Sequence, residues 1–494
     1  MWLTQLLERN RQCRPGRTAL VDEERSVTWA EFHDRTLELA RGLAELGIER
    51  GDRVAVLSKD RIEVLESYFA LARLGALFVP LNHSLAEPEV AGIIERVGAV
   101  AVIGESELLD RHPQLPASVR IRLALDKPAF EALGTLAAER DLPEVADTDP
   151  IAVLHTSATT GQAKGVTVDS GSFRAIALGW LVMARPSDDI VMVNCCPLYH
   201  GSMVVSLTYL AAGATVVLMP GFTPQRALTA VERHRATHMW LVPQMLRFML
   251  QAKASHRTDL SCLREILYGA APMPLDVYAD AVERLGCGFR QVYGMTEVGG
   301  PFVTLGPDEH PAPTDVTARI PCGRVVPGMS ARAVDGGGRE LPPGEIGEIV
   351  VRGPGVMRGY WNDPQATREI ALDGWIRTGD LGFMDDEGRI SLVDRTKDVI
   401  IRAGQNVYPS EIERALLTHP AVRDAAVVGM PDEDYGEVPL AYVVPEPGAD
   451  PGAAALLGHV KGLLAPYKWP RRVEFIEQVP RNPAGKIVKK LLRA

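Results

Sequence analysis

The 494-residue sequence lacks the cysteine patterns of a disulfide scaffold or a zinc site. Only six cysteines are present, and no two of them form a C-x-x-C pair. Zinc sites and secreted disulfide frameworks are recognised by such spacings, so neither is expected here. We expect these cysteines to be buried free thiols in a reducing compartment.

An excess of basic residues is also absent. Lys and Arg total 53 against 63 Asp and Glu, which gives a net charge of -10 at pH 7. Proteins that bind nucleic acid carry basic surfaces that contact phosphates, so we expect no nucleic-acid partner. A negative total does not exclude small anionic ligands held by local Lys and Arg side chains.

Long apolar segments are scarce. Charges interrupt residues 1–17, where a secretory signal peptide needs an apolar run. Residues 201–220 carry no charge, and this length could span a membrane. Ala-Ala-Gly-Ala divides the stretch and its second half is β-branched, which predicts a buried helix followed by a buried strand. We therefore expect a cytoplasmic protein with no membrane span.

What the sequence does contain is a regular alternation of helix-like and strand-like segments. Thr28-Trp-Ala-Glu31 has capping-box spacing and begins a helical pattern, and Val54–Leu57 is an apolar strand candidate. The alternation predicts a largely parallel sheet with helices on its faces. Further strands are expected at residues 151–155, 190–193, 215–219 and 239–242.

The texture changes towards the carboxyl terminus. Residues 320–394 contain short β-like runs among many Gly and Pro residues, and the last hundred residues mix helix and strand patterns. Ser410-Glu-Ile-Glu413 has capping-box spacing and predicts the start of an amphipathic helix. We expect an α/β fold with a large N-terminal domain of residues 1–394, divided near 150 and 320 with a β-rich last part, and a small α+β domain of residues 395–494.

A loop rich in hydroxyl side chains follows the strand candidate Ile151–Leu154. It reads Thr-Ser-Ala-Thr-Thr-Gly-Gln-Ala-Lys-Gly over residues 156–165. Hydroxyls and backbone N–H groups can surround phosphate oxygens, and Lys164 adds a positive charge. The spacing is not that of a Walker loop. Gly353-Pro-Gly-Val-Met-Arg-Gly359 has the wrong spacing for a dinucleotide-binding fingerprint.

Seven further motifs follow this loop in order. They are Pro197-Leu-Tyr-His200, Tyr268-Gly-Ala-Ala-Pro272, Gln291-Val-Tyr-Gly-Met-Thr-Glu297, Gly359-Tyr-Trp-Asn362, Arg377-Thr-Gly-Asp380, Asp394-Arg-Thr-Lys-Asp398 and Pro480-Arg-Asn-Pro-Ala-Gly-Lys486. Over essentially its whole length the chain resembles the adenylate-forming superfamily. That group includes acyl- and aryl-CoA synthetases, nonribosomal-peptide adenylation domains and firefly luciferase.

The resemblance implies a two-step reaction that uses ATP, Mg²⁺ and coenzyme A. A fatty or aromatic acid is first converted to an acyl-adenylate with release of pyrophosphate, and the coenzyme A thiol then displaces AMP. Alternatives within the superfamily are transfer to a carrier-protein thiol or to an amine, and activation of nitrite by a diazotase. A catalytically silent nucleotide-binding protein is disfavoured because the charged motif residues are present.

The resemblance also assigns an ATP site. Asp380 would bind the ribose hydroxyls, Tyr293 would stack on adenine, and Glu297 would be the Mg²⁺ carboxylate. Thr296 would donate to the α-phosphate as a catalytic residue. The full set for ATP and AMP is Thr156, Ser157, Thr159, Thr160, Gly161, Lys164, Gly269, Ala270, Ala271, Pro272, Tyr293, Gly294, Met295, Thr296, Asp380, Leu392 and Arg395.

Lys486 is the residue expected to drive adenylation. A Lys that bridges the carboxylate and the α-phosphate would offset their repulsion. A Lys on a separate domain implies movement, and the resemblance implies that the mobile small domain rotates after the first step, with a hinge at Lys397. Coenzyme A would then meet Gly404, Tyr467 and Lys468.

His200 is expected to gate the acid pocket as a catalytic residue. Amino-acid-activating relatives usually carry an Asp there, so an α-amino acid substrate is disfavoured. Trp240 would shorten the pocket, although a plain core role is an equal alternative. The expected acid-binding set is His200, Trp240, Tyr268, Gly269, Met295 and Val298.

Several positions depart from the family pattern. Ala158 and Ala163 stand where the phosphate loop usually has Gly and Pro. Near the expected coenzyme A side, Arg402-Ala403-Gly404-Gln405 replaces the more usual Ser-Gly-Gly-Glu. Because Arg402 and Ala403 are bulkier than the usual residues, a carrier-protein thiol or an amine stays an alternative acceptor to coenzyme A.

Overall fold

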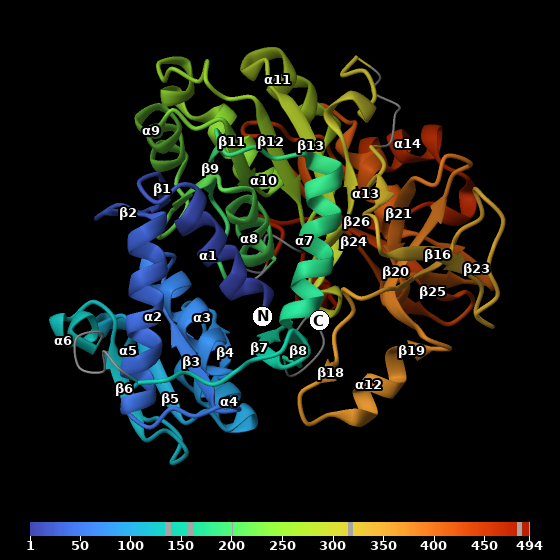
Figure 1. The fold of residues 1–494 in the computed structure, drawn as a ribbon. Helices are drawn as coiled ribbons and strands as arrows, with labels where there is room; N and C mark the ends of the chain where they lie inside the picture. Colours follow the sequence, from blue (N-terminus) through green and yellow to red (C-terminus); the bar gives the residue numbers. More distant parts are fainter. Residues whose placement is uncertain (134–139, 157–162, 200, 315–319, 482–486, 494) are drawn as a thin grey trace. The chain divides into compact units, whose positions relative to one another are not determined.

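The computed structural model describes residues 1–133, 140–156, 163–199, 201–314, 320–481 and 487–493 (Figure 1). These residues form two compact units. The first unit draws on residues 1–330 and 352–371, and the second on residues 331–351 and 372–493. The expected boundary at residues 394 and 395 stays a prediction.

A nine-stranded sheet forms the larger part of the first unit. Its six central strands run parallel, and antiparallel strands lie at both edges. In order across the sheet, the strands are β15 (Arg324–Val325), β14 (Gly300–Leu305), β13 (Gly288–Met295), β12 (Glu265–Gly269), β11 (His238–Leu241), β9 (Val191–Asn194), β10 (Thr215–Leu218), β1 (Thr18–Val21) and β2 (Ser26–Thr28).

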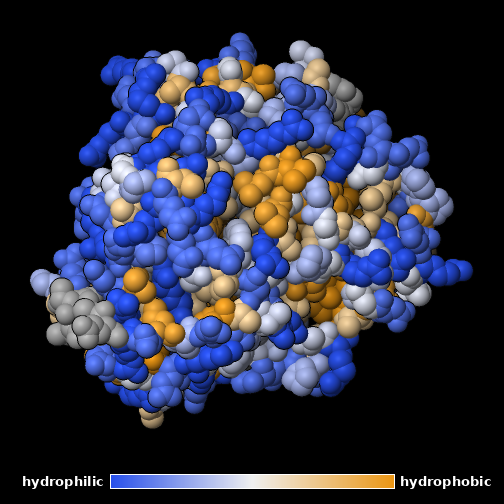
Figure 2. Space-filling model, in the orientation of Figure 1, coloured by the Kyte–Doolittle hydropathy of each residue, from blue (hydrophilic) through white to orange (hydrophobic). Residues whose placement is uncertain are grey.

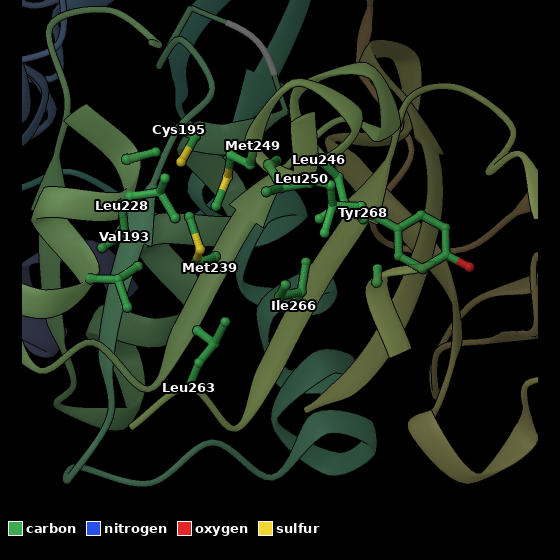
Figure 3. Packing of buried hydrophobic residues seen from close by; sticks show 14 of the residues in the cluster. Val193, Cys195, Leu228, Met239, Leu246, Met249, Leu250, Leu263, Ile266 and Tyr268 are labelled. Carbon is green, nitrogen blue, oxygen red and sulfur yellow. The ribbon is translucent and has the colours of Figure 1, made fainter. Parts of the chain in front are cut away.

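Helices connect these strands and cover the sheet. They are α7 (Ser170–Ala184), α8 (Ser202–Ala212), α9 (Pro224–His234), α10 (Pro243–Gln251) and α11 (Leu275–Leu285). Figure 3 shows strand residues Val193, Met239 and Ile266 packed with Leu228 of α9 and Leu246 of α10. Because these apolar side chains are removed from water, the cluster fixes the strands in position.

A seven-stranded sheet forms the rest of the first unit. Its order is β18 (Gly359–Tyr360), β8 (Gly165–Asp169), β7 (Pro150–His155), β4 (Leu77–Leu81), β3 (Arg53–Leu57), β5 (Ala101–Gly104) and β6 (Ile121–Ala124). The accompanying helices are α1 (Trp2–Cys13), α2 (Trp29–Glu45), α3 (Ile62–Leu74), α4 (Glu87–Val97), α5 (Ser106–Asp110), α6 (Pro128–Ala132) and α12 (Pro364–Ile370). The predicted capping box of Thr28 and Glu31 begins α2.

The uncharged stretch 201–220 is confirmed as a helix followed by a strand. Every residue from Ser202 to Leu210 of α8 is buried, and β10 lies between β9 and β1. No helix among the described residues is long and apolar enough to cross a membrane. The face shown in Figure 2 is mostly hydrophilic, with small groups of hydrophobic side chains.

The second unit contains two five-stranded sheets. The first consists of β16 (Ser330–Val334), β17 (Gly347–Arg352), β20 (Trp375–Met384), β19 (Ala371–Leu372) and β21 (Ile390–Arg395). The second consists of β23 (Gln405–Val407), β22 (Ile400–Arg402), β25 (Gly436–Pro445), β24 (Val422–Asp432) and β26 (Arg472–Phe475), with helices α13 (Pro409–Leu417) and α14 (Ala453–Leu463). The expected α/β class is confirmed.

The predicted capping box at Ser410 is wrong. Pro409 is the first residue of α13, so the N-cap position falls on Tyr408. The Ser410 backbone N–H donates to Asp394 Oδ2 at 2.8 Å, and the Ser410 hydroxyl donates to the Val393 carbonyl. Tertiary partners therefore take the groups that a capping box would have used.

Candidate active site

The carboxyl ends of neighbouring parallel strands carry most of the sequence-predicted site residues of the first unit. Strands β9, β11, β12 and β13 are adjacent and parallel. Segment 195–199 follows β9, Trp240 lies near the end of β11, segment 269–272 begins at the last residue of β12, and the Gly294–Glu297 segment spans the end of β13. Ligands of open α/β sheets bind outside such strand ends. The sheet thus gathers segments that are far apart in the sequence.

Two glycines allow this edge to pack closely. A Cβ atom at Gly269 would lie 2.4 Å from the Val292 carbonyl oxygen, and one at Gly294 would lie 2.3 Å from the Gly300 carbonyl oxygen. Ala270, which follows Gly269 in the Tyr268–Pro272 motif, has a φ of 65°. Side chains are excluded at both glycines because neighbouring backbone occupies the space.

The segment after β13 turns sharply at Thr296. Residues Thr296–Val298 form a short 3-10 helix, which places Glu297 and Val298 in buried positions. The Tyr293 ring lies 5.3 Å from the Phe302 ring, centroid to centroid. The backbone carbonyl of Glu297 accepts a hydrogen bond from Met357 at 2.8 Å. Glu297 is thus held through its backbone as well as its side chain.

The phosphate loop is the connection of a β-hairpin formed by β7 and β8. Thr156 and Lys164 close its stem: the Thr156 N–H donates to the Lys164 carbonyl at 3.1 Å, and the Lys164 N–H donates to the Thr156 hydroxyl at 3.3 Å. His155, the last residue of β7, is buried, and burial lowers its pKa to about 4. It is therefore a neutral ring at pH 7.

Tyr360 is a site residue that sequence reasoning missed. Its hydroxyl donates a hydrogen bond to Glu297 Oε1 at 2.8 Å. The Lys164 Nζ atom lies 4.9 Å from the centroid of the same ring. One tyrosine therefore contacts both the expected phosphate-binding Lys and the expected Mg²⁺ ligand. The Gly359-Tyr-Trp-Asn motif marked this segment, but nothing in it indicated the direction of the Tyr360 side chain.

The donor set around Glu297 fits Mg²⁺. Tyr360 occupies Oε1, and no residue that the structure describes donates a hydrogen bond to Oε2. No group of three or more His, Cys, Asp or Glu side chains that could hold a metal is present among the described residues. Mg²⁺ is commonly bound through one or two carboxylates, substrate phosphates and waters, so a single buried carboxylate is sufficient.

In the second unit the structure brings Asp380 and Arg395 together. They are directly opposite each other on β20 and β21, and Arg395 Nε lies 2.9 Å from Asp380 Oδ1. The Asp380 side chain is 9% exposed, whereas that of Arg395 is 44% exposed. Leu392 lies on the same strand as Arg395, opposite Gly382. A nearly buried carboxylate beside a more exposed guanidinium suits ribose hydroxyls and phosphate oxygens.

The expected coenzyme A side also lies in the second unit. The Lys468 ammonium pairs with Glu411 Oε1 at 2.6 Å, next to Tyr467, and Gly404 has a φ of 79°. Ala403, where the family usually has Gly, adopts a left-handed φ of 49°. This segment therefore keeps a glycine-like backbone despite the substitution.

Arg402 has a role that the sequence did not indicate. Its guanidinium donates to the carbonyls of Pro466 at 3.3 Å and Tyr467 at 2.9 Å. It also lies over the Tyr435 ring, 4.9 Å from the centroid. The side chain thus fixes the turn that carries Tyr467, and its bulk is directed into contacts within this unit.

The acid side of the site is partly described. Trp240 is 5% exposed, and its indole N–H has no hydrogen-bond partner among the described residues. The Tyr268 ring is fully buried, and its hydroxyl hydrogen-bonds with Gln291 at 3.0 Å and His310 at 2.9 Å. A buried unpaired donor is unfavourable unless a ligand satisfies it. The acid-binding roles stay predictions.

Six sequence-predicted site residues lie outside the described residues. They are Ser157, Thr159, Thr160, Gly161, His200 and Lys486. The segments flanking Lys486 are held together, because Arg481 and Ile487 form a β-bridge and the Val488 N–H donates to the Pro480 carbonyl at 2.8 Å. The roles assigned to these six residues likewise stay predictions.

Comparison with known proteins identifies the class that this fold and site define. Residues 7–361 match the AMP-binding enzyme family, and residues 411–486 match the AMP-binding enzyme C-terminal domain. The chain therefore belongs to the AMP-binding enzyme family, which confirms the resemblance to adenylate-forming enzymes.

Curated relatives cover nearly the whole chain. A fatty acid–[acyl-carrier-protein] ligase, ScoC, of Streptomyces coeruleorubidus is 36% identical, covering 99% of this chain and 96% of that protein. A feruloyl-CoA synthase of Amycolatopsis is 37% identical, covering 97% and 96% respectively. An indoleacetate–CoA ligase of Aromatoleum aromaticum is 36% identical over 99% of this chain and 97% of its own length.

Solved structures resemble the fold closely. ATP-bound MatB from Rhodopseudomonas palustris has a TM-score of 0.91 at 30% identity, covering 99% of this chain and 98% of that one. An O-succinylbenzoate coenzyme A synthetase from Bacillus subtilis, in complex with ATP and a magnesium ion, has a TM-score of 0.87 at 30% identity with the same coverages.

Proposed function

We propose that this chain is an AMP-forming acid–CoA ligase that depends on ATP and Mg²⁺ and acts in the cytoplasm. The observation that carries the proposal is the convergence of Lys164 and Glu297 on Tyr360, beside the carboxyl ends of a parallel sheet. In this arrangement the cation can bind the phosphates of Mg·ATP, and the buried carboxylate can bind its metal ion. Relatives that ligate acids to thiols support the same reaction class.

In the first step a carboxylate oxygen of the acid attacks the α-phosphorus of ATP. The bond from this phosphorus to the β-bridging oxygen breaks, and pyrophosphate leaves with the electron pair. Lys164 holds the departing phosphates, Thr296 donates to the α-phosphate, and Lys486 approaches both reacting anions. Glu297 would hold Mg²⁺, which would supply charge neutralisation on the phosphate oxygens. These residues act mainly by position and charge.

In the second step a thiol sulfur attacks the acyl carbon of the adenylate. The new carbon–sulfur bond replaces the carbon–oxygen bond to AMP, the thiol proton goes to solvent, and AMP leaves. Gly404, Tyr467 and Lys468 are assigned to the coenzyme A side. The pairing of Lys468 with Glu411 holds its ammonium in place beside that segment.

We assign a fatty or aromatic acid as the substrate. His200 supplies no fixed negative charge for an α-ammonium group. The Trp240 indole N–H, which has no hydrogen-bond partner among the described residues, suits an acid that brings a hydrogen-bond acceptor.

A carrier-protein thiol is the second candidate acceptor. The relative from Streptomyces coeruleorubidus is a ligase of that kind. Arg402 and Ala403 also depart from the usual coenzyme A segment, and Arg402 is committed to carbonyls of the Pro466–Lys468 turn. Both acceptors use the same adenylation step, so they differ only in the second half-reaction.

Exchange of labelled pyrophosphate into ATP tests the proposal. A panel of fatty, phenylacetic and cinnamic acids should include at least one acid that supports exchange with Mg²⁺ present and none that does so in EDTA. Exchange supported by amino acids alone, or by no carboxylic acid at all, would contradict the assignment.

Substitution of Lys486 should separate the two half-reactions. Lys486→Ala should lower pyrophosphate release at least 100-fold, because two anions then approach without the bridging cation. Thiol transfer from a supplied acyl-adenylate should stay within a few-fold of wild type. Lys490→Ala removes a neighbouring exposed cation and should leave both steps unchanged. Unaltered pyrophosphate release by Lys486→Ala would rule out the assigned role.

A further inference from the structure

Tyr360 is fixed by contacts on several sides. Its strand, β18, pairs with β8, with Tyr360 opposite Val166. Its backbone N–H donates to the Thr367 hydroxyl at 2.9 Å, and that hydroxyl donates to the Asp363 carbonyl at 2.9 Å. The next residue, Trp361, donates its N–H to the Gly165 carbonyl at 2.7 Å. Strand pairing and hydrogen bonds thus hold the backbone at Tyr360 and at the next residue in place.

The Tyr360 hydroxyl is a neutral donor to a charged acceptor. Burial raises the pKa of Tyr360 far above its ordinary value, and the neighbouring Glu297 carboxylate raises it further. The hydroxyl is the donor in its hydrogen bond with Glu297. A hydrogen bond from a neutral donor to a buried carboxylate fixes the direction of that carboxylate. In this geometry Oε1 accepts the Tyr360 hydrogen bond, and no described residue donates a hydrogen bond to Oε2.

The Tyr360 ring interacts with a different partner. Lys164 lies at the stem of the hairpin formed by β7 and β8, and its ammonium lies 4.9 Å from the ring centroid. An ammonium at this distance from an aromatic ring is attracted by the ring's negative face. The hydroxyl and the ring thus restrain two charged side chains that come from separate strand ends.

We propose that Tyr360 is a positioning residue for adenylation, which orients Glu297 for Mg²⁺ through its hydroxyl and restrains Lys164 for the ATP phosphates through its ring. The inference rests on the proposed function, because it assigns those two ligands. A partner that hydrogen-bonds to a metal-binding carboxylate fixes its orientation, and loss of such a partner typically lowers metal affinity by about 10–100-fold.

Two substitutions separate the hydroxyl from the ring. Tyr360→Phe keeps the ring that faces Lys164 and removes only the donor to Glu297. Tyr360→Leu removes both. Tyr278→Phe, on α11 of the same unit, is the matched control, because it deletes a tyrosine hydroxyl that makes no hydrogen bond with Glu297 or Lys164 among the described residues.

The test is calorimetric titration of the full chain with ATP, first in EDTA and then in excess Mg²⁺, with no acid present. Tyr360→Phe should bind ATP like wild type in EDTA. The increase in its ATP affinity on addition of Mg²⁺ should be about tenfold smaller than the increase in wild type. Tyr360→Leu should also bind ATP more weakly in EDTA, since Lys164 is no longer restrained. The control variant should match wild type in both conditions.

The outcomes distinguish this inference from the proposed function. A Mg²⁺-dependent gain in Tyr360→Phe equal to that of wild type would overturn the inference alone. An equal loss of ATP affinity with and without Mg²⁺ would also overturn it, because the hydroxyl would then have no specific link to the metal. Wild-type protein that binds no ATP in either condition would overturn the proposed function itself.

Discussion

At the scale of single residues, Asp60 shows how burial changes the chemistry of a side chain. It follows strand β3 and is 5% exposed, and its Oδ1 accepts a hydrogen bond from the Leu198 N–H at 2.9 Å. Burial raises its pKa to about 8. The carboxyl is therefore mainly protonated at pH 7 and is bound to the segment that precedes His200.

Replacement of Asp60 by Asn should change the pH dependence of stability. The folded pKa lies above the unfolded value of about 4, so the contribution of Asp60 is full below about pH 4 and is lost as pH rises through 8. Asn keeps an acceptor oxygen for Leu198 and does not ionise. The melting temperature of Asp60→Asn should exceed that of wild type by a margin that grows from pH 5 to pH 8 and then levels off. A margin independent of pH would show that Asp60 does not titrate in this range.

At the scale of elements, local sequence signals predicted helix α2 and strands such as β3, β7, β9, β10 and β11, but not the tertiary partners of their side chains. Thr28 and Glu31 satisfy each other across the first turn of α2, so their pattern could be interpreted without the rest of the chain. Ser410 and Glu413 have the same spacing, yet Glu413 accepts the Val427 N–H at 2.8 Å and pairs with Lys489 at 2.9 Å. Those partners lie 14 and 76 residues further along the chain, where a local pattern carries no information.

The same limit applied to the candidate site. Motif order pointed to the strand-end loops and to Asp380 and Arg395 as candidate ATP-binding residues, but not to the ion pair between them. Tyr360, Arg402 and Asp60 were missed as side chains with a function, since their contacts depend on how separate strands pack. The direction of a side chain follows from strand register and burial, which single motifs do not encode.

The ion pair of Glu413 and Lys489 should stabilise the second unit only while both partners are present. Its side chains are 14% and 12% exposed, and burial raises the pKa of Glu413. Lys489→Met leaves a buried carboxylate unpaired and should cost about 3–5 kcal/mol. The double variant Glu413→Gln, Lys489→Met keeps an acceptor for Val427 and should recover more than half of that loss. Calorimetric unfolding measures both, and equal losses would contradict the prediction.

At the scale of the whole molecule, the chain forms two units and carries a net charge of -10, although the ligands of its reaction, ATP and a carboxylate, are themselves anions. The total charge excluded a broad basic surface but could not reveal local cations such as Lys164 and Arg395. Described site residues are divided between the units, with Lys164 and Glu297 in the first and Asp380 and Arg395 in the second. That division is the physical reason for proposing that one unit moves between half-reactions.

A substitution at the proposed hinge should affect one half-reaction only. Lys397 lies in the 3-10 turn Thr396–Asp398 that follows β21, and burial lowers its pKa. Lys397→Pro restricts φ at this position to about −65°, so a rotation that needs another backbone angle is blocked. Adenylate formation should stay within a few-fold of wild type, and thioester formation should fall at least 100-fold in single-turnover measurements. Equal effects on both steps would place the hinge elsewhere.

The most direct test of the central claim is to identify the product of one complete turnover. The enzyme would be incubated with ATP, Mg²⁺ and the acid that supports pyrophosphate exchange. Parallel reactions would contain coenzyme A, a phosphopantetheinylated carrier protein, an amine, or nitrite with an aromatic amine in place of the acid. The account predicts one acyl-CoA for each AMP in the coenzyme A reaction, and little AMP without a thiol. AMP formation that does not depend on coenzyme A and that consumes the amine or nitrite would contradict it.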